Sequence, residues 1–170
     1  VGSEMCIRDR AGMDPENQLC TEDFAGHLAH NANLSAKAIM AIAGYGRLAE
    51  MLNKPEEAKK FTEMAKRMAI EWERRADDGD HYRLAFDMPG TWSQKYNFVW
   101  DKVLGLNILP DRIMKKEVTF YLKTQNKYGL PLDNRFTWGK TDDTVWSATM
   151  ADSEGDFQAV SYTHLRAHET

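Results

Sequence analysis

Apolar residues recur at helical spacing along most of the chain, and strand-like alternation is confined at most to Leu84–Phe86. This periodicity predicts five helices, which begin near Asn33, at Pro55, near Lys95, at Pro110 and near Thr141. The second and fourth have one apolar and one charged face, which is typical of an outer layer. The other three are apolar around much of their circumference, so we expect them to form an inner layer.

The connections between these helices alternate in length. Short links are expected at about 53–55 and 107–110, and long ones at about 77–94 and 126–140, with a similarly long lead-in at 14–32. Helices joined in this way form hairpins whose long loops gather at the end where the inner helices begin. Because long ordered loops in compact domains are usually functional, we expect the functional site at this end.

Composition and charge narrow the class of protein. Hydrophobic residues make up 42% and charged residues 28% of the chain, which is ordinary for a soluble globular protein. A formal net charge of -4 without a basic stripe argues against nucleic-acid binding. No apolar run approaches the roughly 18 to 20 residues that a bilayer-spanning helix needs, so no membrane span is expected.

The two ends differ from the body of the chain. Residues 1–10, VGSEMCIRDR, and residues 160–170, VSYTHLRAHET, lack helical or strand periodicity and resemble translated sequencing-adapter sequence. We therefore expect the native domain to span residues 11–159. Cys20 is the one cysteine in that span, so no disulfide is expected within the domain.

A first cluster of candidate site residues lies in NQLCTEDFAGHLAHNAN, residues 17–33. If residues 23–30 are helical, Asp23, His27 and His30 fall on one face, where a carboxylate and two imidazoles could ligate a metal. A structural histidine pair, substrate binding and proton transfer are the alternatives. A metal is the least favoured role, because Gly26 weakens the helix and no third histidine is near.

The densest cluster lies in GDHYRLAFDMPGTWSQKYNFVWDK, residues 79–102. Aromatic planes beside acids and amides suit a polar organic ligand such as a sugar or an amino acid. Trp92 is the expected pocket wall, whereas Tyr96 and Trp100 are expected in the core. Asp80 could act in the site or stabilise a turn.

A third cluster lies in KYGLPLDNRFTWGKTDDTVW, residues 127–146. Asp133, Asn134 and Arg135 fall in the expected loop. Arg135 could hold a carboxylate by two parallel hydrogen bonds, or it could fix the loop backbone. Asp142 and Asp143 are expected to cap the helix that follows.

Carboxylates are plentiful, whereas nucleophile-elbow, phosphate-loop and dinucleotide motifs are missing from the sequence. Two carboxylates across a cleft could activate water and protonate a leaving group. The residues predicted to be catalytic are Asp23, Asp80, Asp101 and Asp133. The residues predicted to bind substrate are His27, His30, His81, Trp92, Gln94, Lys95, Asn97, Asn134 and Arg135. Neither a metal nor a cofactor is expected.

Three long segments resemble the six-helical-hairpin domain of the glutaminase A family: CTEDFAGHLAHNANLSAKAIMAIAGYG, DGDHYRLAFDMPGTWSQKYNFVWDKVLGLN and NKYGLPLDNR. The resemblance covers about residues 12–159. It implies an all-α fold, a fragment of an (α/α)6 six-hairpin toroid holding about five of some twelve helices. It also implies a secreted or cell-envelope, periplasmic protein. The expected partners are β-rich domains N-terminal to the ring, the remaining hairpins of the same parent chain and a small-molecule substrate.

Three functions stay open. The resemblance implies hydrolysis of L-glutamine to L-glutamate and ammonia, and Asp23 or Asp80 could act as base while Arg135 or Lys95 holds the α-carboxylate. A six-hairpin glycoside hydrolase or carbohydrate-binding barrel would stack a sugar on Trp92 and use two acids. A non-catalytic barrel would serve only in assembly. As a fragment, the chain is expected to be inactive alone and to expose apolar surface.

Overall fold

The computed structural model describes residues 13–16 and 26–166, with side chains described as far as Ser161. Within these residues the chain is all-α, as predicted, and isolated β-bridges take the place of strands. The helices are α2 (Ala32–Met51), α3 (Pro55–Ala76), α4 (Val99–Val103), α5 (Asp111–Thr124), α6 (Thr141–Thr149) and α7 (Glu154–Arg166), and the short 3₁₀ helix η1 (Tyr96–Phe98) directly precedes α4.

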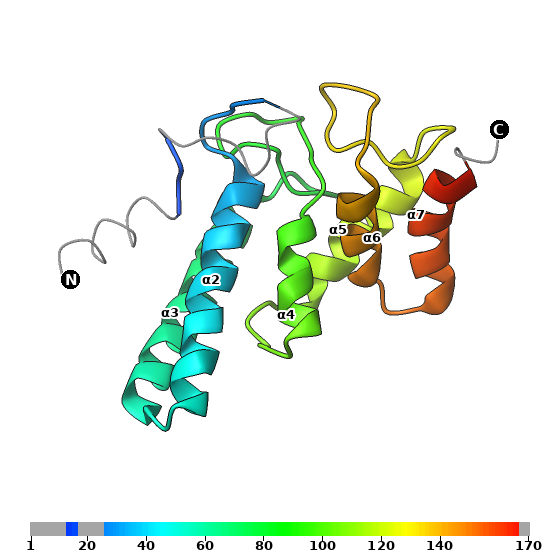
Figure 1. Cartoon of the computed structure of the whole chain (residues 1–170). Helices are drawn as coiled ribbons and strands as arrows, with labels where there is room; N and C mark the ends of the chain where they lie inside the picture. Colours follow the sequence, from blue (N-terminus) through cyan, green and yellow to red (C-terminus); the bar gives the residue numbers. More distant parts are fainter. Residues whose placement is uncertain (1–12, 17–25, 167–170) are drawn as a thin grey trace.

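The described helices form three hairpins, α2/α3, α4/α5 and α6/α7, which stand side by side in chain order (Figure 1). One row is made by α2, η1 with α4, and α6, which contact one another in that order. The other row is α3, α5 and α7. Ion pairs join α3 to α5, from Glu73 to Arg112 and from Asp77 to Lys116, and α5 contacts α7.

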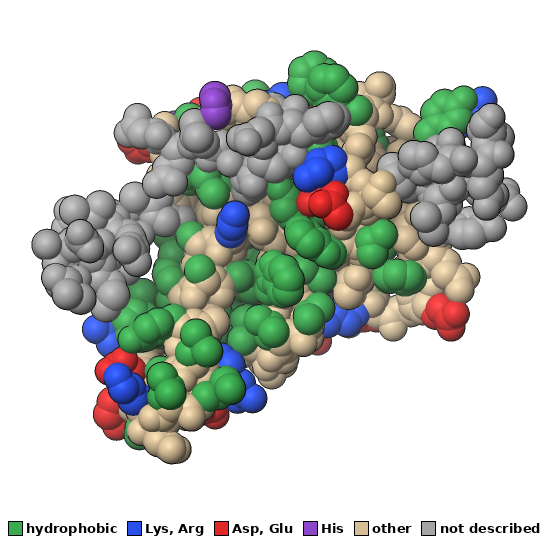
Figure 2. Space-filling view, in the orientation of Figure 1, with side chains coloured by type: hydrophobic (Ala, Val, Ile, Leu, Met, Phe, Trp, Pro, Cys, Tyr) green, Lys and Arg blue, Asp and Glu red, His purple; other side chains and the backbone are tan. Residues whose placement is uncertain are grey.

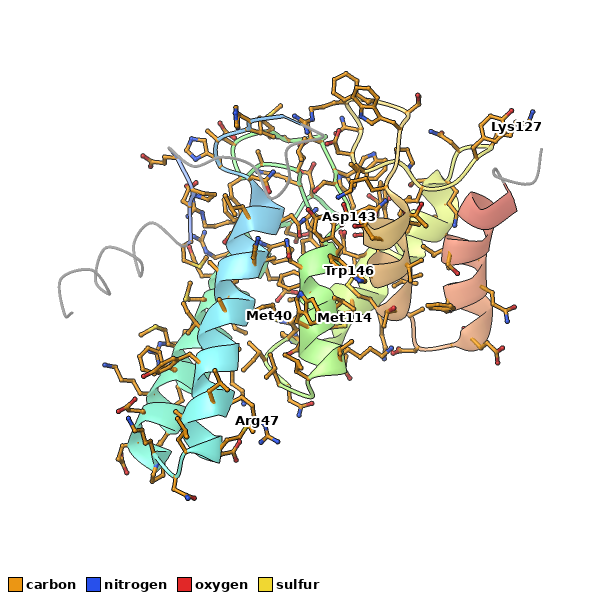
Figure 3. All side chains as sticks on the ribbon, in the orientation of Figure 1. Met40, Arg47, Met114, Lys127, Asp143 and Trp146 are labelled. Carbon is orange, nitrogen blue, oxygen red and sulfur yellow. The ribbon has the colours of Figure 1, made fainter. Side chains whose placement is uncertain are left out.

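The long loops lie together at one end of the molecule, as the connection lengths predicted (Figure 1). The short turns at 52–54, 104–110 and 150–153 lie at the opposite end. Figure 3 marks the two ends: Arg47 lies toward the turns and Lys127 lies among the loops. None of the helices in the described part of the chain combines the length and apolar character that crossing a bilayer requires.

The core is centred on Trp72 of α3, which is fully buried. Its indole Nε1 donates to the Ala32 carbonyl at 2.8 Å, and its ring packs against Tyr82 and Phe98 at centroid distances of 4.9 and 4.6 Å. These contacts connect the start of α2, the loop after α3 and η1. The apolar stripe predicted for α3 is confirmed, because Phe61, Ala65, Met68, Ala69, Trp72 and Ala76 are all buried.

The helix predicted over residues 95–106 is much shorter in the structure. A 3₁₀ turn replaces its start, and the α-helix ends at Val103 because Gly105 takes a left-handed conformation at φ 59°. Tyr96 is buried as predicted, but the prediction that Trp100 lies in the core is wrong. The buried face of α4 carries Val99 and Asp101, which leaves the indole of Trp100 partly open to solvent.

The C-terminal hairpin departs from the sequence prediction in two ways. Residues 160–166, predicted to lack periodicity, belong to α7. The Ser153 hydroxyl accepts from the Asp156 N–H and donates to the Asp156 carboxylate, so Ser153 caps the start of this helix. The predicted caps of α6 are wrong, because Lys140 is its N-cap and makes no side-chain capping bond there.

Candidate functional site at the loop end

Three segments, which we call the loop rim, form the candidate site: residues 26–31, 77–95 and 125–140. Backbone hydrogen bonds connect them although they lie far apart in sequence. These bonds run from the N–H of Ala32 to the carbonyl of Leu84, from Phe86 to His30, from Gln94 to Leu132 and from Asn134 to Trp92. These backbone hydrogen bonds hold the three segments of the loop rim in fixed positions relative to one another.

Lys95 lies fully buried beneath the loop rim. Its ammonium donates to the Tyr82 carbonyl at 3.1 Å, to the Ser93 carbonyl at 2.8 Å and to the Ser93 hydroxyl at 3.0 Å. Burial lowers the pKa of Lys95 to about 8, although the carboxylates of Glu117 and Asp133 oppose the shift. The ammonium thus has an acceptor for each of its three protons, and these bonds hold the parts of the 77–95 segment around Tyr82 and Ser93 together.

Glu117 of α5 is the acidic partner of Lys95, with Oε2 4.0 Å from Nζ. Its carboxylate accepts from the Tyr82 N–H at 2.9 Å and from the Tyr121 hydroxyl at 2.5 Å, and that hydroxyl accepts from the Lys95 N–H. Burial raises the pKa of Glu117. Glu117 was not among the residues predicted from the sequence. Its signal was a lone acid between Ile113 and Tyr121, on the apolar face of the predicted helix.

Gln94 and Asp133, both predicted site residues, are also buried in this framework. The Gln94 amide donates to the carbonyls of Leu130 and Pro131 and to the Thr144 hydroxyl, and its oxygen accepts from Ser147. Asp133 accepts two hydrogen bonds from the Arg135 guanidinium and one from the Arg135 N–H. These contacts fix the 125–140 loop against α6.

Asn97 and Asp101 lie deeper still, below the loop rim. The Asn97 amide donates to the Asn33 carbonyl at 3.2 Å, joining η1 to α2. Asp101 accepts from the N–H groups of Ile108 and Leu109, which closes the turn after α4. Burial raises the pKa of Asp101. The structure thus gives both side chains partners in the framework rather than a position on the surface.

The predicted site residues that remain accessible lie on the loop rim. His27 and Asn134 are exposed, and Trp92 is half-buried with its ring 5.5 Å from that of Phe120. The side-chain oxygen Oδ1 of Asn134 accepts from the backbone N–H of Trp92 at 3.1 Å. Arg135 is half-buried in its pairing with Asp133. These residues can meet a ligand without any movement of the framework.

Asp80 and His81 form one carboxylate–imidazole pair on the loop rim, with Oδ1 2.8 Å from Nδ1. The Asp80 side chain is 71% exposed. Its hydrogen bond with His81 lowers the pKa of Asp80, which keeps the carboxylate ionised at neutral pH. The His81 ring stacks on Phe120 at 4.6 Å, and its Nε2 lies 3.6 Å from Asp78.

His30 and Asp14 form a second pair, with His30 Nδ1 2.5 Å from Asp14 Oδ1. The other carboxylate oxygen of Asp14 accepts from Arg75 at the end of α3. On the far side of the imidazole, Nε2 lies 4.0 Å from Asp87. Asp14 was missed because it lies 16 residues before His30, and only the folded chain brings the two together.

The helical face predicted for residues 23–30 is absent over its described part, because residues 26–30 form loop and turn. Gly26 and His30 both have positive φ there, at 75° and 59°. Asp23 lies outside the described residues. Among the residues that are described, no group of three or more histidine, cysteine, aspartate or glutamate side chains is placed to hold a metal ion.

Comparison with known proteins gives a consistent set of matches. A family model described as "Glutaminase A six helical-hairpin domain" matches residues 9–170. "Glutaminase A" of Aspergillus oryzae is 33% identical over 141 residues, which cover 81% of this chain and 20% of that protein. "Probable glutaminase" of Arthroderma benhamiae is 29% identical over 159 residues, covering 76% of this chain and 18% of that protein. The chain therefore spans about a fifth of the length of these curated relatives.

Proposed function

We propose, because the chain belongs to the glutaminase A six helical-hairpin domain family, that it is part of a hydrolase that converts L-glutamine to L-glutamate and ammonia. The observation that carries the proposal is the family match over residues 9–170. Two relatives named as glutaminases support it. In this proposal the three described hairpins are half of a six-hairpin ring, and the parent protein supplies the other half.

The reaction is assigned to the loop rim. Hydrolysis of a carboxamide needs a group that takes a proton from water and a group that gives one to the leaving amine. Asp80 suits the first role, because its carboxylate is ionised, 71% exposed and oriented by His81. The buried side chains of Lys95, Gln94 and Asp133 suit the role of framework, since their polar atoms are engaged within the protein.

The test measures ammonia release from L-glutamine by the parent protein. We expect activity in the wild type, and a fall in kcat of about a hundredfold or more in Asp80→Asn, because the variant loses the group that accepts the proton from water. The matched control is Glu57→Gln, which alters a hydrogen-bonded carboxylate at the turn end of α3. A wild-type parent that leaves glutamine intact contradicts the proposal.

Carbohydrate hydrolysis or binding is a second candidate, supported by exposed aromatic rings on the loop rim. Phe136 and Trp138 are 48% and 46% exposed, with ring centroids 4.6 Å apart. Trp92 adds a half-buried ring on the segment whose backbone pairs with this loop, since its carbonyl accepts from the Asn134 N–H. Flat aromatic surfaces of this kind suit a sugar ring. Reducing-sugar release from a glycan panel, without ammonia release, favours this candidate. If the parent protein releases neither ammonia nor reducing sugar, the result favours a role in assembly alone.

A further inference from the structure

The geometry points to His30, held by Asp14, as the group that donates a proton to the leaving amine, and this inference rests on the proposed function. It adds a second proton-transfer group to Asp80. His30 is the catalytic residue in this assignment. Asp14 is a positioning residue, because it acts through the imidazole and not on the substrate.

Two other segments of the chain fix the backbone of His30 in place. Its N–H donates to the Pro15 carbonyl at 3.2 Å, and its own carbonyl accepts from the Phe86 N–H at 3.0 Å. Its φ of 59° lies in the left-handed region, which is uncommon for residues other than glycine and often marks functional positions. The backbone hydrogen bonds with Pro15 and Phe86 thus hold His30 in an unfavourable conformation. The direction of the imidazole is therefore set by contacts with distant parts of the chain.

The carboxylate that orients the ring is itself anchored. Asp14 bridges the His30 imidazole and the Arg75 guanidinium, and Arg75 stacks on the Phe86 ring at 4.6 Å. Nδ1 is therefore committed to Asp14. Nε2 lies 4.0 Å from Asp87, beyond hydrogen-bond distance, and the His30 side chain is 29% exposed. The Nε2 proton is the one that a substrate can reach.

The charges around the imidazole favour its protonated form. Asp14, Asp87 and Glu16 are the acidic groups that face it, and Arg75 is the basic group that meets Asp14. The hydrogen bond with Asp14 is the main cause that raises the pKa of His30, and burial opposes it. An imidazolium near neutral pH is matched to donating a proton in a hydrolysis.

In this step the water oxygen bonds to the amide carbon while a base takes one water proton, the carbon–nitrogen bond breaks, and the Nε2 proton of His30 passes to the leaving nitrogen. Ammonia and the carboxylic acid are the products. The base then releases its proton and His30 regains one through solvent, so both groups return to their starting states.

The test compares His30→Asn and Asp14→Asn in the parent protein. Asparagine tolerates the left-handed conformation, so His30→Asn preserves the backbone while it removes the proton donor. We expect kcat to fall by about 10²- to 10⁴-fold in His30→Asn. In the wild type, activity falls as pH rises through the pKa of His30. In Asp14→Asn this loss of activity at high pH, the basic limb of the pH profile, moves to lower pH, because the hydrogen bond that raises the pKa of His30 is gone. The control Glu57→Gln leaves both kcat and the pH profile unchanged.

A wild-type kcat in His30→Asn overturns the inference, and so does a basic limb that stays in place in Asp14→Asn. Failure of the proposed function looks different. If the parent cleaves a glycan and not glutamine, and His30→Asn abolishes that cleavage, the substrate is wrong and the proton donor is right. If glutamine is cleaved normally by His30→Asn, the substrate is right and the proton donor is wrong.

Discussion

At the scale of single residues, Lys95 and Glu117 join the loop rim to α5. Both are fully buried, and their remaining polar atoms bind Ser93, Tyr82 and Tyr121. Burying two charges costs free energy that the ion pair and its hydrogen bonds offset. Because the pair holds the loop that carries Asp80, it contributes to the position of the candidate site as well as to stability.

We expect Glu117→Gln to lower the free energy of unfolding by about 3–5 kcal/mol, because the buried Lys95 ammonium loses the larger of the two carboxylate charges that compensate it. Urea denaturation of the chain at neutral pH measures this. The control is Glu63→Gln, an exposed position on α3, which should leave the denaturation midpoint unchanged. Equal midpoints for the wild type and Glu117→Gln contradict the role assigned to the pair.

At the scale of elements, α2 and α3 approach closely through Gly46. A Cβ at this position would lie 2.9 Å from Thr62 Oγ1, 3.2 Å from the Thr62 nitrogen and 3.3 Å from the Ala58 carbonyl oxygen. A Cβ at Gly44, on another face of the same helix, would meet nothing within 4 Å. The close contact between the two helices therefore lies at one of the two glycines of α2.

The different surroundings of Gly44 and Gly46 predict opposite effects of an alanine substitution at the two positions. Gly44→Ala should raise the free energy of unfolding by about 0.5–1 kcal/mol, because alanine favours the helix and meets no obstacle. Gly46→Ala should lower it by about 1–3 kcal/mol, since the two helices must move apart. Thermal and urea denaturation of the two variants provide the comparison. Equal effects at both positions would mean that α2 and α3 are not in close contact at Gly46.

At the scale of the whole molecule, one face is conspicuously apolar. Figure 2 shows hydrophobic side chains gathered over α2 and α4. The exposed large hydrophobic residues of these two helices include Leu48, Met51, Trp100 and Val103, and the ring of Trp146 on α6 lies 5.9 Å from that of Trp100. The resemblance to a six-hairpin ring predicts exposed apolar surface where further hairpins would pack. An exposed apolar face of this kind promotes association.

We expect the isolated chain to self-associate, and Leu48→Gln combined with Val103→Gln to shift it toward the monomer, because both changes remove apolar surface from this face. Sedimentation velocity over a concentration series measures the shift. Leu122→Gln is the control, since Leu122 is exposed on α5 in the other row. Association that persists unchanged in the double variant places the contact on another surface.

The sequence by itself determined the all-α class, the boundaries of α2, α3 and α5, the gathering of long loops at one end and the family. These features depend on local periodicity, proline positions and connection length, which are properties of neighbouring residues. It also located the segments of the loop rim. It could not separate Asp80, which is exposed, from Asp133, which is buried, because both are aspartates in polar loops.

Only the tertiary structure decided which polar groups meet. The pairs Asp14–His30 and Lys95–Glu117 join residues 16 and 22 positions apart, counted from their numbers, and no helical or strand spacing relates them. Likewise, α4 ends early and Trp100 is exposed because of a left-handed glycine and the packing of neighbouring helices. Burial and partnership are set by how the hairpins pack, and burial determines whether a polar side chain supports the site or can meet a substrate.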